Sequence, residues 1–177
     1  DDFNPRTLTQ GVVASLAPLA ASKYITLDLS VDCELPHALV GDSGRLRQVL
    51  VNLIGNAVKF TETGGVRVTL TQRNLEGDGV ELLVEVSDTG IGIAANVLPT
   101  LFERFTQADS STARRYGGSG LGLAISHEIL ALMNGRISVK SDLGRGSTFR
   151  VVVPLVRRDE KELTDEDTGN DLPADMS

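Results

Sequence analysis

The chain has 177 residues, of which 41% are hydrophobic and 23% charged, as expected for one globular domain with or without a tail. The formal net charge of −7 argues against nucleic acid as a main partner, and no apolar stretch is long enough to span a bilayer. The single cysteine, Cys33, excludes an intrachain disulfide and a cysteine-based zinc site, and it fits a reducing compartment.

The first part of the chain predicts two helices separated by a strand. Apolar residues at helical spacing predict a helix over 8–21, and strict alternation predicts a half-buried strand over 26–31. Asp42-Ser43 then caps a long helix that ends near Phe60.

The remainder predicts further strands separated by helical stretches. In chain order we expect strands over 66–73 and 80–87 joined by a hairpin loop, a weak helix over 93–101, a polar loop over 106–116, a helix over 120–133, and a closing strand pair over 136–141 and 147–154. This irregular alternation predicts an α/β (α+β) two-layer sandwich, in which a mixed sheet packs against helices on one face.

The chain divides into a domain and a tail by composition. We assign residues 1–156 to the domain. Residues 157–177 contain three basic and eight acidic residues and show no apolar periodicity, which predicts a disordered tail or linker.

Three motifs carry groups that suit a bound Mg-nucleotide. The first is Asn52-x-x-x-Asn56-Ala57-x-Lys59-Phe60 on the long helix, where both asparagines and the lysine fall within one arc of about 80°. An amide oxygen is a hard ligand suited to Mg²⁺, and Lys59 can reach a phosphate. The alternative is a solvated polar stripe, which explains most helices of this kind.

The second motif, Asp88-Thr89-Gly90-Ile91-Gly92-Ile93, follows the second strand of the hairpin. A carboxylate at a strand end can accept a hydrogen bond from an exocyclic amine, which would select adenine over guanine. The two glycines let the backbone approach a ligand closely. A plain Asp-Thr-Gly turn is the alternative interpretation.

The third motif, Gly117-Gly118-Ser119-Gly120-Leu121-Gly122-Leu123, opens a helix. Its bare backbone N–H groups lie at the positive end of the helix dipole, which favours a phosphate. The polar loop before it predicts a mobile lid, from which Arg114 or Arg115 would contact the terminal phosphate. A flexible hinge with solvated arginines is the alternative. No G-x-x-x-x-G-K-[ST] sequence occurs, so this is not a P-loop.

Together these segments resemble the catalytic, ATP-binding domain of sensor histidine kinases, within the wider gyrase/Hsp90/histidine kinase/MutL class of ATPases. The resemblance covers about residues 3–156, with the N, G1, F and G2 boxes of the family at 52–60, 88–93, 102–105 and 117–123. The stretches 105–109 and 114–118 look most like those of hybrid kinases, which carry receiver domains. The resemblance implies the Bergerat fold, with ATP between the N-box helix and the lid.

The resemblance also implies roles for individual residues. Asn52, Asn56, Lys59 and Arg115 match catalytic positions, and Asn56 matches the Mg²⁺ ligand. The implied ATP-binding set, in which Asp88 binds the adenine amine, is Asn56, Lys59, Phe60, Asp88, Gly90, Gly92, Ile93, Phe105, Arg114, Tyr116, Gly117, Gly118, Ser119, Gly120, Leu121, Gly122 and Leu123.

One part of the family pattern is absent. The substrate histidine of these kinases lies in a His-Glu-x-x-x-Pro-like segment, and neither His37 nor His127 lies in one. The resemblance therefore implies an enzyme that binds Mg-ATP and transfers the γ-phosphoryl group to a histidine on a separate dimerisation and phosphotransfer helical domain, in cis in the full protein. A receiver domain would be the next partner in this two-component signalling.

Two alternative functions remain open, a hydrolytic ATPase and a non-catalytic module. A hydrolytic ATPase of the same fold would hold a glutamate at the position of Asn52, because an amide cannot act as a general base. A non-catalytic nucleotide-sensing or docking module is the other alternative. We expect a cytoplasmic, monomeric domain, alone or as the cytoplasmic part of a membrane-anchored sensor, without nucleic-acid or membrane contact.

Overall fold

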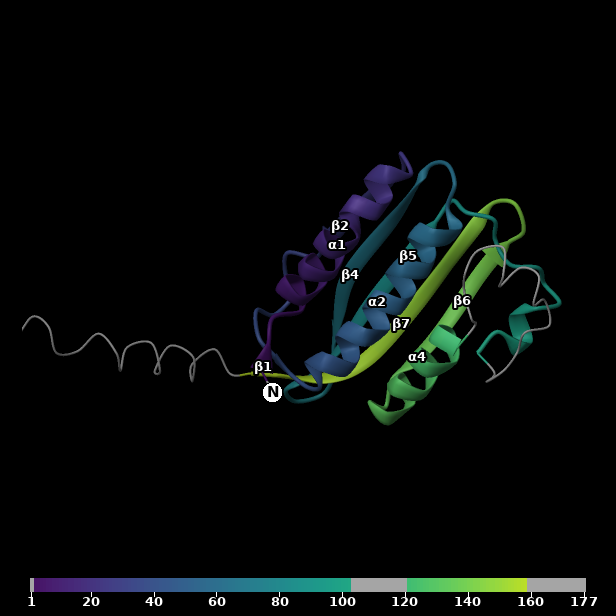
Figure 1. Cartoon of the computed structure of the whole chain (residues 1–177). Coiled ribbons are helices and arrows are strands. Elements are labelled where there is room, and N and C mark those ends of the chain that lie inside the picture. The colour runs from purple at the N-terminus through teal and green to yellow at the C-terminus, as the bar shows by residue number, and fades with distance from the viewer. Residues whose placement is uncertain (1, 103–120, 159–177) are drawn as a thin grey trace, which may run out of the picture.

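In the computed structural model, which describes residues 2–102 and 121–158, a sheet forms one layer and helices form the other (Figure 1). The helices are α1 (Pro5–Ser22), α2 (Ser43–Phe60) and α4 (Leu121–Leu132), with a 3₁₀ turn η1 (Leu98–Thr100). The strands are β1 (Asp2–Phe3), β2 (Thr26–Val31), β3 (Leu39–Val40), β4 (Gly65–Asn74), β5 (Gly79–Asp88), β6 (Arg136–Asp142) and β7 (Gly146–Arg157). This two-layer arrangement with a mixed sheet confirms the predicted fold class.

The sheet has the strand order β1-β3-β7-β5-β4-β2, and β6 also pairs with β7. β2 and β4 run parallel, and the other pairs of described strands are antiparallel. β5 therefore lies in the middle, between β4 and β7. Its last residue, Asp88, is opposite Val66 on one side and Ser147 on the other.

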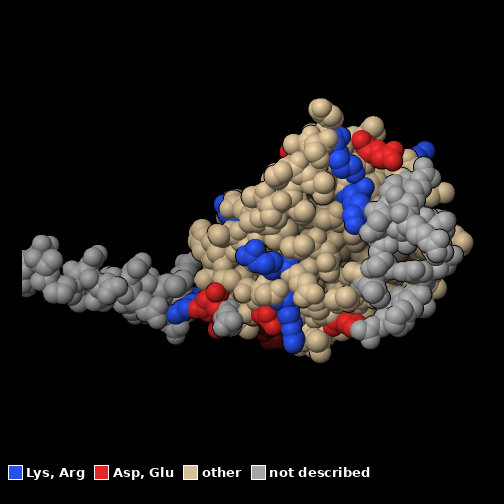
Figure 2. All heavy atoms as spheres, viewed as in Figure 1, with Lys and Arg blue, Asp and Glu red and all other residues tan. Residues whose placement is uncertain are grey.

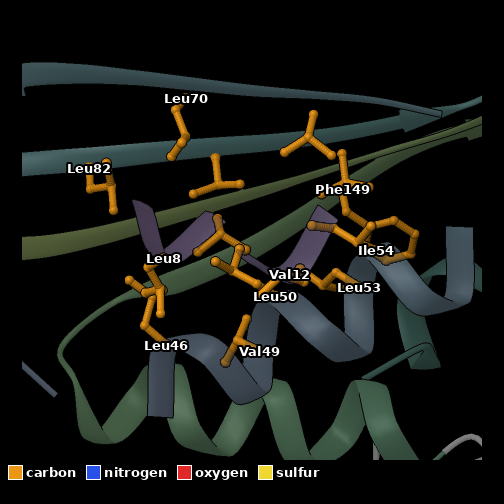
Figure 3. Packing of buried hydrophobic residues seen from close by; sticks show 14 of the residues in the cluster. Leu8, Val12, Leu46, Val49, Leu50, Leu53, Ile54, Leu70, Leu82 and Phe149 are labelled. Carbon is orange, nitrogen blue, oxygen red and sulfur yellow. The ribbon is translucent and has the colours of Figure 1, made fainter. Parts of the chain in front are cut away.

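The hydrophobic core lies between the sheet and the helices. Leu8 and Val12 of α1 and five apolar residues of α2 pack toward the sheet residues Leu70, Leu82 and Phe149 (Figure 3). Alternation along β4 and β5 buries every second side chain on this face, and each fully buried Val, Leu or Ile contributes about 1.5–3 kcal/mol. The α2 residues in this contact are Leu46, Val49, Leu50, Leu53 and Ile54.

α2 is fixed at both ends by side chains. At its start, the Asp42 carboxylate accepts a hydrogen bond from the Arg45 N–H at 3.0 Å, as a helix cap does. At its end, Lys23 Nζ donates to the carbonyl oxygens of Val58 and Lys59, each at 2.7 Å. A cation at this position satisfies carbonyls that have no partner in the helix and interacts favourably with the helix dipole.

Three predictions need correction. The weak helix over 93–101 is wrong for most of its length, because η1 is the helical part and the Ile93 N–H donates to the Ser141 hydroxyl. β7 runs on to Arg157 because its end pairs with β3. β1 and β3 were not predicted, since two residues cannot display an alternating pattern. The predicted loop over 106–116 and most of the predicted tail lie outside the described residues.

None of the described helices combines the length and the apolar content that crossing a bilayer would require.

Candidate functional site

Asp88 lies at the end of β5, on the face of the sheet that the helices cover. Its Oδ1 accepts hydrogen bonds from the backbone N–H groups of Gly90 at 2.9 Å and Ser147 at 3.3 Å. Burial raises the pKa of the Asp88 carboxyl, and these two hydrogen bonds oppose that shift. Among the described residues both bonds go to Oδ1, so within this part of the chain Oδ2 is left to accept a hydrogen bond from a ligand.

The turn after Asp88 is fastened to the segment that follows α2. The Thr89 hydroxyl donates to Thr63 O at 2.8 Å and accepts from the Gly65 N–H at 3.0 Å. A Cβ built on Gly90 would lie 2.5 Å from Phe60 O, so only a glycine allows this approach. The structure thus brings the Asp-Gly motif against the end of the Asn motif.

The other side of the turn meets the hairpin between β6 and β7. The Gly144 N–H donates to Ile91 O at 2.7 Å. Gly92 has φ +72°, which favours glycine, and a Cβ there would collide with the carbonyl oxygen of Asp142. Two backbones therefore lie in direct contact at this point.

Asn52 joins α2 to α4. Its Nδ2 donates to Gly122 O at 3.4 Å and to the buried Ser126 hydroxyl at 3.3 Å. A Cβ on Gly122 would lie 3.8 Å from Asn52 Cγ, so α4 starts close to this amide. The first and third motifs are therefore neighbours through a side chain that is itself engaged.

Asn56 lies one helical turn beyond Asn52 and is half-buried. Its side chain makes no hydrogen bond to any of the described residues, in contrast to Asn52. The Asn56 amide oxygen is therefore available as a hard ligand, and it fits the Mg²⁺ that the sequence predicts. The exposed Lys59 follows in the last turn of α2.

Basic side chains lie at the end of α1 and α2 that carries Asn56. Figure 2 shows basic side chains, with acidic ones beside them, at the end of the visible face where α1 and α2 finish, and further basic side chains elsewhere on this face. Lys23 and Lys59 both belong to this end. A polyanionic ligand near it would be attracted by these charges.

The described residues include one part of the predicted site. Ile93 and Leu123 are half-buried and pack against the core, and Phe60 is half-buried at the end of α2. Leu121 begins α4. Phe105, Arg114, Arg115, Tyr116, Gly117, Gly118, Ser119 and Gly120 lie outside the described residues.

Sequence reasoning missed the serines behind Asp88. The Ser141 hydroxyl lies 2.7 Å from the Ser147 hydroxyl and accepts from the Ile93 N–H, also at 2.7 Å. In the sequence we interpreted both serines only as strand residues, Ser141 at the end of the predicted strand over 136–141 and Ser147 at the start of that over 147–154. The contact between the two serines follows from the pairing of β6 with β7. The contact of Ser147 with Asp88 depends on the register of β5 against β7, which no local pattern reveals.

Neither of the two histidines, His37 and His127, lies in a segment like the one that carries the phosphoacceptor histidine in these kinases. His37 is exposed in the loop before β3. His127 is exposed on α4, and its ring stacks on Phe102 with the ring centroids 5.7 Å apart. Phe102 in turn meets Phe149 edge to face. His127 thus packs on the first residue of the predicted F box.

Comparison with family models gives one match. Residues 41–157 match the family described as "Histidine kinase-, DNA gyrase B-, and HSP90-like ATPase". The matched stretch contains α2, the Asp88 turn, the start of α4 and the closing hairpin.

Relatives of known function are long proteins that resemble this chain over a short part. The chain is 44% identical over 174 residues to Hybrid signal transduction histidine kinase L of Dictyostelium discoideum, covering 98% of this chain and 10% of that protein. It is 45% identical over 154 residues to Sensor histidine kinase AruS of Pseudomonas aeruginosa, covering 87% and 15%. For Signal transduction histidine-protein kinase BarA of Escherichia coli K12 the identity is 42% over 147 residues, covering 83% and 16%.

Two solved structures show the same fold. Full-length ShkA in complex with AMPPNP superposes with a TM-score of 0.74 at 37% identity, covering 89% of this chain and 31% of that chain. The catalytic domain of histidine kinase ThkA superposes with a TM-score of 0.66 at 24% identity, covering 87% and 94%. The chain therefore has the length and the architecture of one catalytic domain within larger proteins.

Proposed function

Because the chain belongs to the histidine kinase-, DNA gyrase B- and HSP90-like ATPase family, we propose that it binds Mg-ATP and transfers the γ-phosphoryl group to a histidine of a separate helical domain. This activity would place it in two-component signalling, with a receiver domain as the next acceptor. The relatives are named histidine kinases, and one similar structure was solved with AMPPNP, an analogue of ATP.

The observation that carries the proposal is the environment of Asp88. Two backbone N–H groups hold Oδ1, which fixes the carboxylate plane and leaves Oδ2 as an acceptor. An acceptor held in this way suits the exocyclic amine of adenine. Guanine presents a carbonyl oxygen at that position, which would repel the carboxylate.

The triphosphate would lie along α2 toward the start of α4. Asn56 would hold Mg²⁺ through its amide oxygen, and the ion, when bound, would neutralise charge on the phosphates. Lys59 would contact a phosphate, and the predicted glycine-rich segment would supply backbone N–H donors. The work of these groups is to position the γ-phosphoryl group for in-line attack by the histidine.

The role of Asn52 favours transfer over hydrolysis. Its amide donates to α4 and has no basic group that could take a proton from water. Asn52 therefore acts as a positioning residue between α2 and α4. We therefore expect the chain to bind ATP without hydrolysing it until a phosphoacceptor histidine is available.

The test is a transfer reaction with γ-labelled ATP. The chain is mixed with a purified dimerisation domain that carries a phosphoacceptor histidine, and label on that domain and free phosphate are both followed. We expect an acid-labile label on the histidine domain that is lost with Asp88→Asn and kept with Asp28→Asn, an exposed carboxylate on β2. Steady phosphate release without labelled histidine would favour the hydrolytic ATPase. ATP binding with neither product would favour a nucleotide-sensing module.

A further inference from the structure

The hairpin between β6 and β7 contacts the Asp88 turn at several points, and one side chain, that of Ser141, joins them. Ser141 is half-buried on β6 and faces the helices, as do Ile137 and Val139 on the same strand. Its Oγ lies 2.7 Å from Ile93 N, 2.9 Å from Gly146 O and 2.7 Å from Ser147 Oγ. Three polar groups, one from the Asp88 turn and two from the start of β7, therefore converge on one hydroxyl.

The valence of a serine hydroxyl decides the direction of these bonds. It has one hydrogen to donate and two lone pairs with which to accept. The Ile93 N–H can only donate and Gly146 O can only accept, so Ser141 accepts from the first and donates to the second. The Ser147 hydroxyl must then donate to Ser141 for all three contacts to be hydrogen bonds. In this assignment Ser141 has no capacity left for a ligand.

Ser141 thereby acts on both ends of the Asp88 turn. At the start of the turn, Ser147 donates its backbone N–H to Asp88 Oδ1, and its side chain is held by Ser141. At the end of the turn, the Ile93 N–H is held by Ser141 directly. The resemblance implies that Asp88 binds the adenine amine and that Ile93 belongs to the ATP-binding set. Both residues are thus positioned by a residue outside the turn.

We propose that Ser141 is a positioning residue for base recognition, which sets the Asp88 turn in the conformation that distinguishes adenine from guanine. The inference rests on the proposed function, because it concerns the same nucleotide site. It differs from a purely structural role in one respect. Loss of the hydroxyl should weaken the nucleotide whose base Asp88 recognises and leave the contribution of the phosphates unchanged.

The experiment compares Ser141→Ala with two matched variants. Ser141→Thr keeps the hydroxyl, and Ser138→Ala removes an exposed hydroxyl from the opposite face of the same strand. Dissociation constants for ATP and GTP are measured on each. Amide exchange of Gly90 and Ile93 is measured by NMR on the nucleotide-free proteins.

We expect Ser141→Ala to weaken ATP binding about tenfold, the equivalent of one lost hydrogen bond with an unsatisfied partner, with little change for GTP. The Ile93 amide should also exchange about tenfold faster without nucleotide. Ser141→Thr and Ser138→Ala should resemble the unmodified chain in both measurements.

Equal losses for ATP and GTP, or unchanged exchange at Ile93, would overturn the proposal. Failure of the unmodified chain to prefer ATP would instead contradict the proposed function and with it the base-recognition role, whatever Ile93 shows. If Ser141→Ala does not fold, Ser141→Cys keeps the side-chain volume with a weak hydrogen-bonding group and decides by the same two measurements.

Discussion

At the residue scale, the position of Asp88 suits ligand binding but lowers the stability of the nucleotide-free fold. Burial raises its pKa above the ordinary value of 3.8, because desolvation penalises the charged carboxylate, and the hydrogen bonds from Gly90 and Ser147 oppose this shift only in part. Stability from this group is fully present below 3.8 and is lost as pH rises through the raised value. A polar ligand that pairs with Oδ2 would recover that loss on binding.

Asp88→Asn should therefore stabilise the nucleotide-free chain at pH 7 while removing ATP selectivity. The asparagine oxygen can still accept from Gly90 and Ser147. The gain in melting temperature should shrink as the pH is lowered toward 4, because Asp88 itself becomes neutral. A lower melting temperature for the variant at pH 7 would show that the charge of Asp88 stabilises the fold.

The two asparagines of α2 should behave differently when each is truncated. Asn52→Ala removes the hydrogen bonds to Gly122 and Ser126 and should cost about 1–3 kcal/mol of unfolding free energy. Asn56→Ala removes no hydrogen bond among the described residues, so it should leave stability unchanged and abolish the Mg²⁺ dependence of ATP binding. Urea unfolding and titrations with and without Mg²⁺ check both, and equal stability losses would contradict this division of roles.

The sequence patterns predicted some of these residues and missed others. Asp88, Asn52 and Asn56 could be predicted because each lies in a short motif on a recognisable strand or helix. Ser141 and Ser147 could not, because the Ser147 N–H reaches Asp88 across 59 residues of sequence. The sequence also could not show which of the two asparagines, Asn52 or Asn56, forms hydrogen bonds to α4, since this depends on where α4 packs.

At the element scale, the turn and the hairpin that contact each other owe their proximity to glycine. Gly92→Ala should destabilise the chain by more than Gly144→Ala. Both residues have positive φ, which costs an alanine about 1 kcal/mol, but only a Cβ on Gly92 meets another backbone. Chemical denaturation of the two variants measures the difference, and equal losses would show that the Asp142 contact is unimportant.

The end of α2 should depend on Lys23. Lys23→Met removes two hydrogen bonds to the Val58 and Lys59 carbonyl oxygens and should cost about 1–2 kcal/mol. Lys140→Met, on an exposed position of β6, serves as the control and should be neutral. The comparison is made by urea unfolding, and a neutral Lys23→Met would mean that water replaces the lysine without loss.

The long elements were predictable and the short ones were not. α1, α2, β2, β4 and β5 match their patterns because each buries one regular face. The stretch 93–101 misled because its apolar residues pack on the core from a turn that Gly92 and Ser141 shape. Tertiary contact there outweighs local helix propensity.

At the scale of the whole molecule, the helices cover one face of the sheet (Figure 1). The core lies between these two layers, and the candidate site lies at the end of that face where Asp88 ends β5. α2 contacts both, since its apolar side packs on the sheet and its Asn residues lie toward α4 and the site. The fold class and the three motifs were predictable together because each motif ends or begins a regular element. The domain limits at 156 and the tail remain a proposal.

Calorimetric titration can decide whether Asp88 forms part of an adenine-selective Mg-nucleotide site. ATP and GTP are titrated with and without Mg²⁺ into the chain and into Asp88→Asn. We expect Mg²⁺-dependent binding of ATP in preference to GTP, and we expect the substitution to remove it. Equal affinity for the two nucleotides, or ATP binding that survives Asp88→Asn, would contradict this expectation.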